Sequence, residues 1–243
     1  MNFEQRRVVI TGASRDFGRT LAIRFAGLGA EVFVSSRTLE GSRRVADEIR
    51  DLGHEKVRAF ACDLADAASI RRFAADVAEC TDRVDVLVNN GARWLEGPDL
   101  LSASDEDVID TIAAGATGTV LMVKRLLPLL LASDRPDVVN MISAAGLSGH
   151  HRSTAHDAFY AAKSAQAGFA DILSRRLRPR GVRVVSLYPP DFRNPDPLSP
   201  EWESTPRGSD DMLTAHSVAE CAFFALGQPR DCFIKSFHFE QAP

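Results

Sequence analysis

The sequence has little of what a disulfide-stabilised, membrane-spanning or nucleic-acid-binding protein needs. Its four cysteines lack CxxC spacing, so we expect free thiols in a reducing compartment and assign no metal site. No apolar run approaches the roughly 18 residues that cross a bilayer. The formal net charge of -4 comes from interspersed acidic and basic residues, without a basic stripe. We therefore expect a cytoplasmic protein with a small-molecule substrate, no nucleic acid and no membrane partner.

Seven short segments rich in β-branched or aromatic residues are typical of strands. They are RVVIT, EVFVSS, KVRAFAC, VDVLVNN, DVVNMIS, RVVSLYP and CFIKSFHF. Helix-period segments lie between them, at Phe17–Leu28, Gly41–Leu52, Ala67–Cys80, Asp105–Leu131, Ala158–Leu177 and Ser217–Leu226. This alternation, with strands apolar on both faces, predicts a single-domain α/β fold over residues 1–243. We expect a doubly wound Rossmann fold whose seven-stranded parallel sheet is flanked by helices.

A glycine-containing turn follows the first predicted strand and leads into an amphipathic helix and a second strand within about 30 residues. Gly12 suits a turn with unusual backbone angles, and Gly18 permits close approach where the helix begins. Free amides at that helix end favour a pyrophosphate. The alternative is a helix cap with tight packing, but the strand-turn-helix context favours a dinucleotide site.

One long irregular segment, residues 189–213, is dense in Pro, Asp and Ser. Such a loop inside a compact domain is usually functional or disordered. We expect it to cover the substrate pocket as a lid. Its aromatic residues, Phe192 and Trp202, favour an apolar or ring-bearing substrate.

The turn TGASRDFG resembles the TGxxxGxG motif of classical short-chain dehydrogenases/reductases, with Asp16 at the middle glycine. That carboxylate would either repel the diphosphate or cap the helix. The resemblance extends through CDLAD, VLVNNGA and LYPPDF, and its redox members use a nicotinamide dinucleotide. It implies cofactor contacts at Gly12, Ser14, Arg15, Phe17, Gly18, Ser36, Arg37, Asp63, Leu64, Asn90, Gly91, Lys163 and Pro189.

Cofactor choice in this family is read at the end of the second strand. An acidic residue there would accept a hydrogen bond from an NAD ribose hydroxyl, whereas this sequence has Ser35, Ser36 and Arg37. Arg37 and Arg15 offer forked, permanently charged donors to a 2′-phosphate. We therefore expect NADP(H) in preference to NAD(H).

The segment HDAFYAAKSAQAGF aligns with the family's catalytic helix. Ser143 matches the serine that steadies the substrate oxygen, and Lys163 matches the lysine that lowers the pKa of a catalytic tyrosine. In that register Phe159 occupies the tyrosine position. Tyr160 is one residue further on, which in a regular helix turns its side chain by roughly 100°. A distorted first turn would restore Tyr160 as the acid; otherwise we expect it to pack.

The asparagine of the family's proton relay aligns with Gly115. Three histidines, His150, His151 and His156, lie on the loop before Phe159, and His moves protons near neutral pH. We therefore take Ser143, Tyr160, Lys163 and His151 as the candidate catalytic residues.

Three functions are open at this point. The first is an NADP(H)-dependent oxidoreductase acting on a carbonyl/alcohol pair with a non-standard proton donor. The second is a non-redox enzyme such as a cyclase, isomerase or dehydratase that uses loop histidines, and the third is a catalytically idle binding protein. We favour the first, because a proton donor is replaced more easily than a cofactor site. The resemblance also implies a homodimer or homotetramer.

Overall fold

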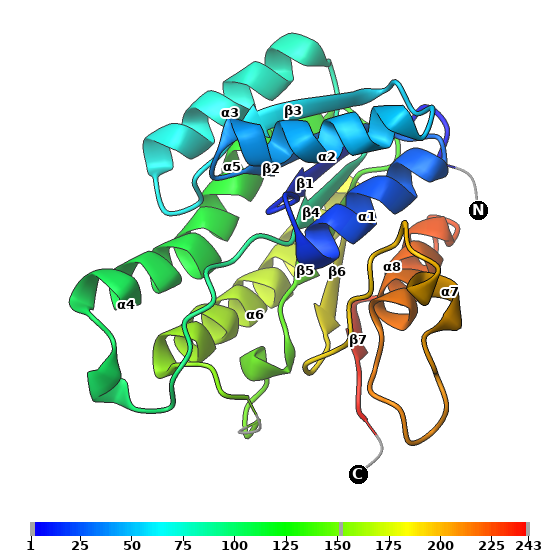
Figure 1. Ribbon diagram of the computed structural model, residues 1–243. Coiled ribbons are helices and arrows are strands. Elements are labelled where there is room, and N and C mark those ends of the chain that lie inside the picture. Colours follow the sequence, from blue (N-terminus) through cyan, green and yellow to red (C-terminus); the bar gives the residue numbers. More distant parts are fainter. Residues whose placement is uncertain (1–2, 151–152, 242–243) are drawn as a thin grey trace.

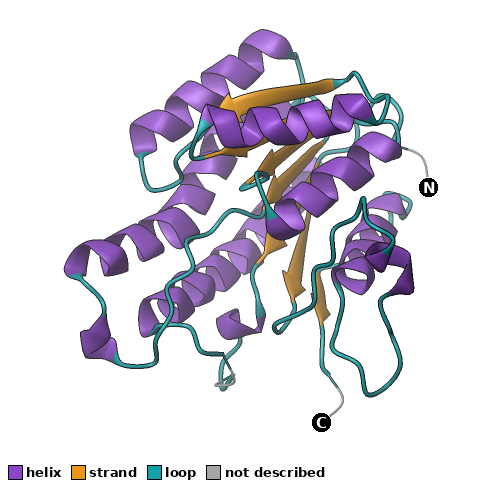
Figure 2. Cartoon of the chain, in the orientation of Figure 1, coloured by secondary structure: helices purple, strands orange, loops and turns teal. Residues whose placement is uncertain are grey.

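A parallel sheet between two layers of helices forms the protein in the computed structural model, which describes residues 3–150 and 153–241 (Figures 1 and 2). The strands are β1 (Arg7–Thr11), β2 (Glu31–Ser36), β3 (Val57–Ala61), β4 (Val86–Asn89), β5 (Asp137–Met141), β6 (Arg183–Tyr188) and β7 (Ser236–His238). Their order in the seven-stranded sheet is β3-β2-β1-β4-β5-β6-β7, and every pairing is parallel. The predicted doubly wound Rossmann fold is confirmed.

Helices alternate with the strands at the places where the sequence predicts them. The longer ones are α1 (Asp16–Gly27), α2 (Leu39–Asp51), α3 (Ala67–Cys80), α4 (Asp105–Ile112), α5 (Gly118–Leu131), α6 (Asp157–Leu177) and α8 (Ala215–Gly227). Short elements are η1 (Leu100–Ser102), η2 (Ala113–Thr117), η3 (Ala144–Gly146), η4 (Arg178–Arg180) and α7 (Glu201–Ser204). The predicted helix ends differ from the observed ends by at most two residues, whereas the last strand, predicted at 232–239, spans only Ser236–His238.

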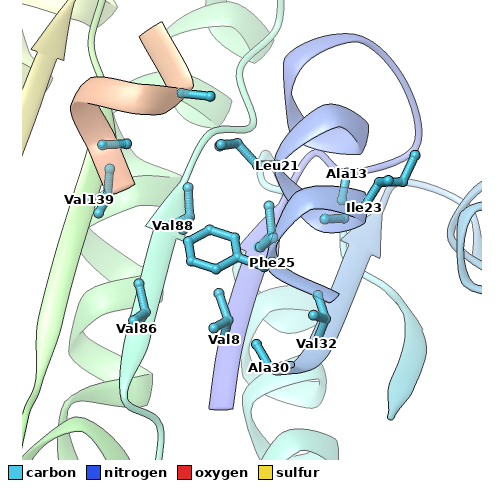
Figure 3. Packing of buried hydrophobic residues seen from close by; sticks show 14 of the residues in the cluster. Val8, Ala13, Leu21, Ile23, Phe25, Ala30, Val32, Val86, Val88 and Val139 are labelled. Carbon is cyan, nitrogen blue, oxygen red and sulfur yellow. The ribbon is translucent and has the colours of Figure 1, made fainter. Parts of the chain in front are cut away.

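Two apolar clusters, one on each face of the sheet, hold the layers together. On one face the strands pack against α1, α2 and α8, and on the other against α3, α5 and α6. Figure 3 shows part of the first cluster, where Leu21 and Phe25 of α1 lie over Val8 and Val88. Because both faces are covered, strand residues of both parities are buried, which explains the continuous apolar runs.

The predicted helix 105–131 is one continuous rod whose middle, η2, is a π-helical turn. At Gly115 in this turn, an added Cβ would lie 2.9 Å from the Cβ of Ala162, so α6 packs closely there. By length and mean hydropathy this rod reaches the values of a membrane span, and the sequence expectation of no such segment is wrong on those two criteria. One such helix is weak evidence of a membrane span, because the core helix of a soluble protein passes the same test; 44% of its most apolar window is buried inside the protein.

Candidate active site

A cavity of about 780 Å³ opens where the chain leaves the carboxyl ends of the central strands. In parallel α/β sheets this edge is where ligands bind. Three turns meet there: Gly12 follows β1, Asn90 follows β4 and Ser143 lies just beyond β5. All thirteen residues that the sequence assigns to cofactor binding line this one cavity, from Gly12 to Pro189.

Glycines allow the first two turns to touch. Gly12 has a φ of 65°, and an added Cβ there would lie 2.5 Å from the Cα of Gly91. At Gly18 an added Cβ would lie 2.3 Å from the carbonyl oxygen of Gly12. The hydroxyl of Thr11 accepts hydrogen bonds from the amides of Asn90 and Gly91, at 3.1 and 3.0 Å. The glycine motif therefore joins the β1 and β4 turns into one floor.

The N-terminus of α1 faces the cavity without a side-chain cap. Arg15 precedes the helix and makes no capping hydrogen bond. Of our two alternatives for Asp16, the helix cap is wrong, because Asp16 is itself the first helical residue and its exposed carboxylate pairs with Arg15 at 3.4 Å. Asp16 has a φ of 48°, a left-handed conformation that Asp tolerates better than most residues. This is why Asp is accommodated where the family has glycine.

At the end of β2, Ser36 and Arg37 line the cavity together with Arg15. The Ser36 hydroxyl donates to the carbonyl of Thr38 at 2.8 Å and contacts the hydroxyl of Ser42 at 2.9 Å, so its polar atom holds the turn. Arg37 is exposed. The two arginines, rather than the serine, are the groups at this end that remain open to a ligand.

Ser143 lies just beyond β5 in a strained backbone conformation. Its φ is 94°, which a residue with a Cβ rarely adopts and which costs on the order of 1–3 kcal/mol. Its Oγ accepts a hydrogen bond from the amide of Ala145 at 3.2 Å. An oxygen that accepts one hydrogen bond keeps its own proton for another acceptor. Ser143 is therefore placed to donate into the cavity.

Helix α6 is regular at the position where the sequence leaves two alternatives. Phe159 and Lys163, four residues apart, both line the cavity, and the Lys163 nitrogen lies 5.5 Å from the Phe159 ring centre. Tyr160 is half-buried beside Phe159 and lies outside that lining. Its hydroxyl accepts from the amide of Ser153 at 3.1 Å and donates to the Ser153 carbonyl at 3.3 Å. Tyr160 thus anchors the preceding loop, and the structure does not bring it together with Ser143 and Lys163.

The loop histidines are placed differently from one another. His156 is fully buried as the N-cap of α6, and its Nδ1 accepts from the amide of Ala158 at 3.1 Å. His150 is half-buried, and its side chain is outside the cavity lining. His151, the histidine that we named as a candidate acid, lies outside the described residues.

Lys163 is a buried cation with an exposed fraction of 4%. Its ammonium donates to the carbonyl of Met141 at 2.7 Å and to Oε1 of Gln166 at 3.2 Å. Burial lowers the pKa of Lys163 to about 7. A lysine with that pKa exchanges its proton near neutrality, which an exposed lysine does not do.

Sequence reasoning missed the wall formed by Arg93 and Trp94 after β4. Both line the cavity, where the Trp94 ring lies 4.9 Å from Phe159 at an angle of 64°. The Arg93 guanidinium bridges Asp107 and Asp110 at 2.5 Å each, and Asp110 also lines the cavity. No periodic pattern marks this loop, and the only available signal was its position directly after the NNG turn.

The segment 189–213 folds back over α1 and contributes Phe192 to the cavity. The Phe192 ring packs edge-on against Phe17 at 5.3 Å, and Asp196 pairs with Arg19 at 2.9 Å. Trp202, expected to face the substrate, is instead buried 5.3 Å from the ring of His216 on α8. The aromatic contact of this segment with the cavity is therefore made by Phe192.

A parallel doubly wound sheet, a glycine turn feeding an uncapped helix, and a serine and a lysine at the same edge define a dinucleotide-dependent enzyme of the Rossmann class. Residues 6–198 match the family described as short chain dehydrogenase. The chain belongs to this family and is a short-chain dehydrogenase/reductase, whose members use NAD(P).

Characterised relatives differ in what they act on. The chain is 33% identical over 183 residues to D-threitol dehydrogenase of Mycolicibacterium smegmatis, covering 74% of this chain and 68% of that protein. It is 30% identical over 196 residues to fatty acyl-CoA reductase of Acinetobacter baylyi, covering 80% of this chain. The chain spans 65% of the length of that reductase.

Solved structures share the whole fold. A metagenomic short-chain oxidoreductase in complex with NADP is 25% identical, has a TM-score of 0.80, and is covered over 99% of both chains. A short chain dehydrogenase from Salmonella enterica serovar Typhi is 26% identical with a TM-score of 0.81, covering 97% of this chain and 96% of that chain. The cavity described above is therefore built on a scaffold that holds NADP in a relative.

Proposed function

We propose that the protein is an NADP(H)-dependent oxidoreductase that interconverts a carbonyl and an alcohol on a small, ring-bearing substrate. One observation carries the proposal: a single cavity joins the dinucleotide turns to Ser143, Phe159 and Lys163. The relative bound to NADP supports the choice of cofactor. The tyrosine that normally supplies a proton is replaced by Phe159, so the proton donor differs from that of the family.

The residues at the cavity fit a dinucleotide. The first-turn amides of α1 have no side-chain cap and favour an anionic diphosphate, and the touching glycines keep the floor narrow enough for backbone contact. Bound NADPH supplies the hydride. Ser143 then holds the carbonyl oxygen through its hydroxyl proton, whose direction is set by the hydrogen bond from Ala145.

Preference for NADP(H) rests on the end of β2, where Arg37 and Arg15 line the cavity and no acidic residue follows Ser36. A guanidinium bound to a phosphate contributes about 1.5–3 kcal/mol, which corresponds to roughly 10- to 150-fold in affinity. We expect NADPH to bind at least tenfold more tightly than NADH. Arg37→Ala would remove most of that difference and leave NADH binding unchanged. Tighter binding of NADH to the native protein would overturn the NADP(H) assignment.

A ring-bearing substrate is supported by the paired rings of Trp94 and Phe159, and by Phe192 in the same cavity lining. Flat apolar surfaces of this kind bind rings through offset and edge-on contacts. The test is NADPH loss, followed by absorbance, with matched cyclic and acyclic ketones, aldehydes and imines. We expect the cyclic and aromatic members to react with the lower KM. No NADPH loss with any member would overturn the carbonyl/alcohol function and favour a non-redox reaction in the same cavity.

Assembly into a homodimer or homotetramer is part of the proposal. The rod 105–131 and α6 carry exposed apolar side chains, namely Ile109, Ile112, Val120 and Ile172. Exposed apolar area of this kind favours burial against a second copy. Light scattering would give a mass of twice or four times 26.5 kDa, and Ile109→Lys with Ile172→Lys would reduce it. A monomeric native protein at micromolar concentration would contradict this part.

A further inference from the structure

With Phe159 in the tyrosine position, a reduction in this cavity needs another proton source. The cavity lining on α6 offers one ionisable group, Lys163, one helical turn beyond Phe159. Tyr160 is bound to the loop through Ser153, and His156 is buried as a helix cap. Lys163 is therefore the ionisable group of α6 that lines the cavity, and its nitrogen lies 5.5 Å from the Phe159 ring centre.

Two neutral acceptors hold the Lys163 ammonium. Its donors reach the Met141 carbonyl at 2.7 Å and Oε1 of Gln166 at 3.2 Å. An ammonium has three N–H bonds, so one remains for a group in the cavity that Lys163 lines. Neither acceptor carries a charge that would hold the proton in place.

Gln166 is fixed by a buried chain of hydrogen bonds. Its Nε2 donates to Oγ1 of Thr119 at 2.9 Å, and that hydroxyl donates to the Gly115 carbonyl at 2.8 Å. Because the Thr119 proton is already committed to Gly115, Thr119 must accept from the amide nitrogen of Gln166. The amide oxygen of Gln166 therefore faces Lys163. The family's relay asparagine is replaced by Gly115, and Gly115 now ends a chain that begins at the lysine.

Among the residues that the structure describes, no ion pair involves Lys163, whose ammonium is bound by neutral oxygens. The elements packed on α6 include η2 and η3, which have no titratable side chain, and α4, whose Asp107 and Asp110 are bound by Arg93. The other titratable groups of α6 and of the elements packed on it are Asp105, Glu106, Asp157, Tyr160, Asp171, Arg175, Arg176, Arg178, Arg180, Arg183 and Tyr188. Within the described chain, burial is the cause of the lowered pKa of Lys163.

We propose that Lys163 is itself the general acid and base of the reaction, and that Gln166 positions its ammonium. The inference rests on the proposed function. With the hydride that bound NADPH would supply to the carbonyl carbon, an N–H bond of Lys163 would break and an O–H bond would form on the substrate oxygen held by Ser143. The products would be the alcohol, NADP⁺ and a neutral amine of Lys163, which would take a new proton from water. Oxidation runs through the same steps in reverse.

A first experiment needs neither cofactor nor substrate. The chain has four lysines, so ¹³C,¹⁵N-lysine NMR gives few signals, and Lys163→Met identifies the one of interest. We expect Lys163 to titrate near pH 7 in the native protein. In Gln166→Glu a carboxylate replaces the neutral acceptor, and the pKa of Lys163 should rise by at least 1. Titration of Lys163 above pH 9.5 in the native protein would overturn the proposal.

The second experiment uses a ketone found in the NADPH panel. The ammonium is the active form in reduction, so kcat should fall as pH rises through the pKa measured by NMR. In Gln166→Glu the pH at which kcat falls should increase by the same amount as the pKa of Lys163 measured by NMR. In Gln166→Met the pH at which kcat falls should stay at or below its native value. If the pH at which kcat falls is the same in the native protein and in both variants, with turnover intact, then Lys163 is not the acid and the proposed function still holds. Failure of the function itself is recognised differently, by absence of NADPH loss.

Discussion

Tyr160→Phe gives the sharpest test of the helix register. In the sequence this tyrosine is one residue away from the position that pairs with Lys163, and in the structure its hydroxyl is bound to the backbone of Ser153. The variant removes one donated and one accepted hydrogen bond and leaves the ring in place. We expect its effect to appear in stability and not in catalysis.

The size of the effect follows from those two bonds. Each contributes about 0.5–1.5 kcal/mol, and water replaces part of both because Tyr160 and Ser153 are only half-buried. We expect a loss of about 1 kcal/mol in unfolding free energy, which lowers Tm by about 2–4 °C in a domain of this size. Removal of a general acid lowers turnover by about 10²- to 10⁴-fold. The two outcomes differ by far more than any measurement error.

The assay compares kcat for NADPH oxidation with one cyclic ketone and Tm by calorimetry, in native protein and Tyr160→Phe. The matched variant is Phe159→Leu, which changes the neighbouring ring that does line the cavity. We expect Phe159→Leu to raise KM, and Tyr160→Phe to keep kcat within twofold. If Tyr160→Phe lowers kcat 100-fold with Tm unchanged, then the register reasoning is wrong.

Three further outcomes are expected. Gly18→Ala places a Cβ 2.3 Å from the carbonyl oxygen of Gly12, so the floor must shift and NADPH titration should show at least tenfold weaker binding. Asp137→Ala leaves the buried Arg183 unpaired, and urea unfolding should show a loss of about 3–5 kcal/mol while NADPH affinity stays unchanged at the opposite end of the sheet. Lys163 has a pKa of about 7 in the fold, against an ordinary value of 10.5. Between these pH values the unfolded chain binds the extra proton, so unfolding free energy rises with pH by up to about 1.4 kcal/mol per unit, and Lys163→Met should abolish that rise.

Most of the fold could be predicted from the sequence because its signals are local. Apolar runs, which reflect burial on both faces of the sheet, predicted all seven strands. Helical periodicity predicted the six long helical segments. The glycine turn also predicted its surroundings correctly, since Gly12 and Gly18 each approach backbone atoms more closely than a residue with a Cβ could. For Tyr160, helix geometry left both packing and catalysis open, and we kept it as a candidate catalytic residue; the structure places it outside the cavity lining.

What the sequence left out depends on contacts between distant segments. Asp is a residue type that often caps helices, but Asp16 has a left-handed backbone conformation and is the first residue of α1 instead. The sequence could not identify Arg93 as a cavity residue, because its hydrogen-bond partners on α4 are 14 and 17 residues away in the chain. Gln166 stands three residues after Lys163, a spacing that puts both on one helix face, and only Thr119 on a neighbouring helix shows which way its amide points.

The charges that line the cavity have a consequence for how fast a cofactor arrives. Three cations and four anions line it besides Lys163, namely Arg15, Arg37 and Arg93 against Asp16, Asp63, Asp110 and Asp191. A dinucleotide with several phosphate charges is steered quickly only by a strongly positive opening, and such steering weakens steeply with ionic strength. Here the opening is close to neutral. The association rate of NADPH should therefore be ordinary and nearly insensitive to salt, while discrimination between cofactors lies in how slowly the bound one departs.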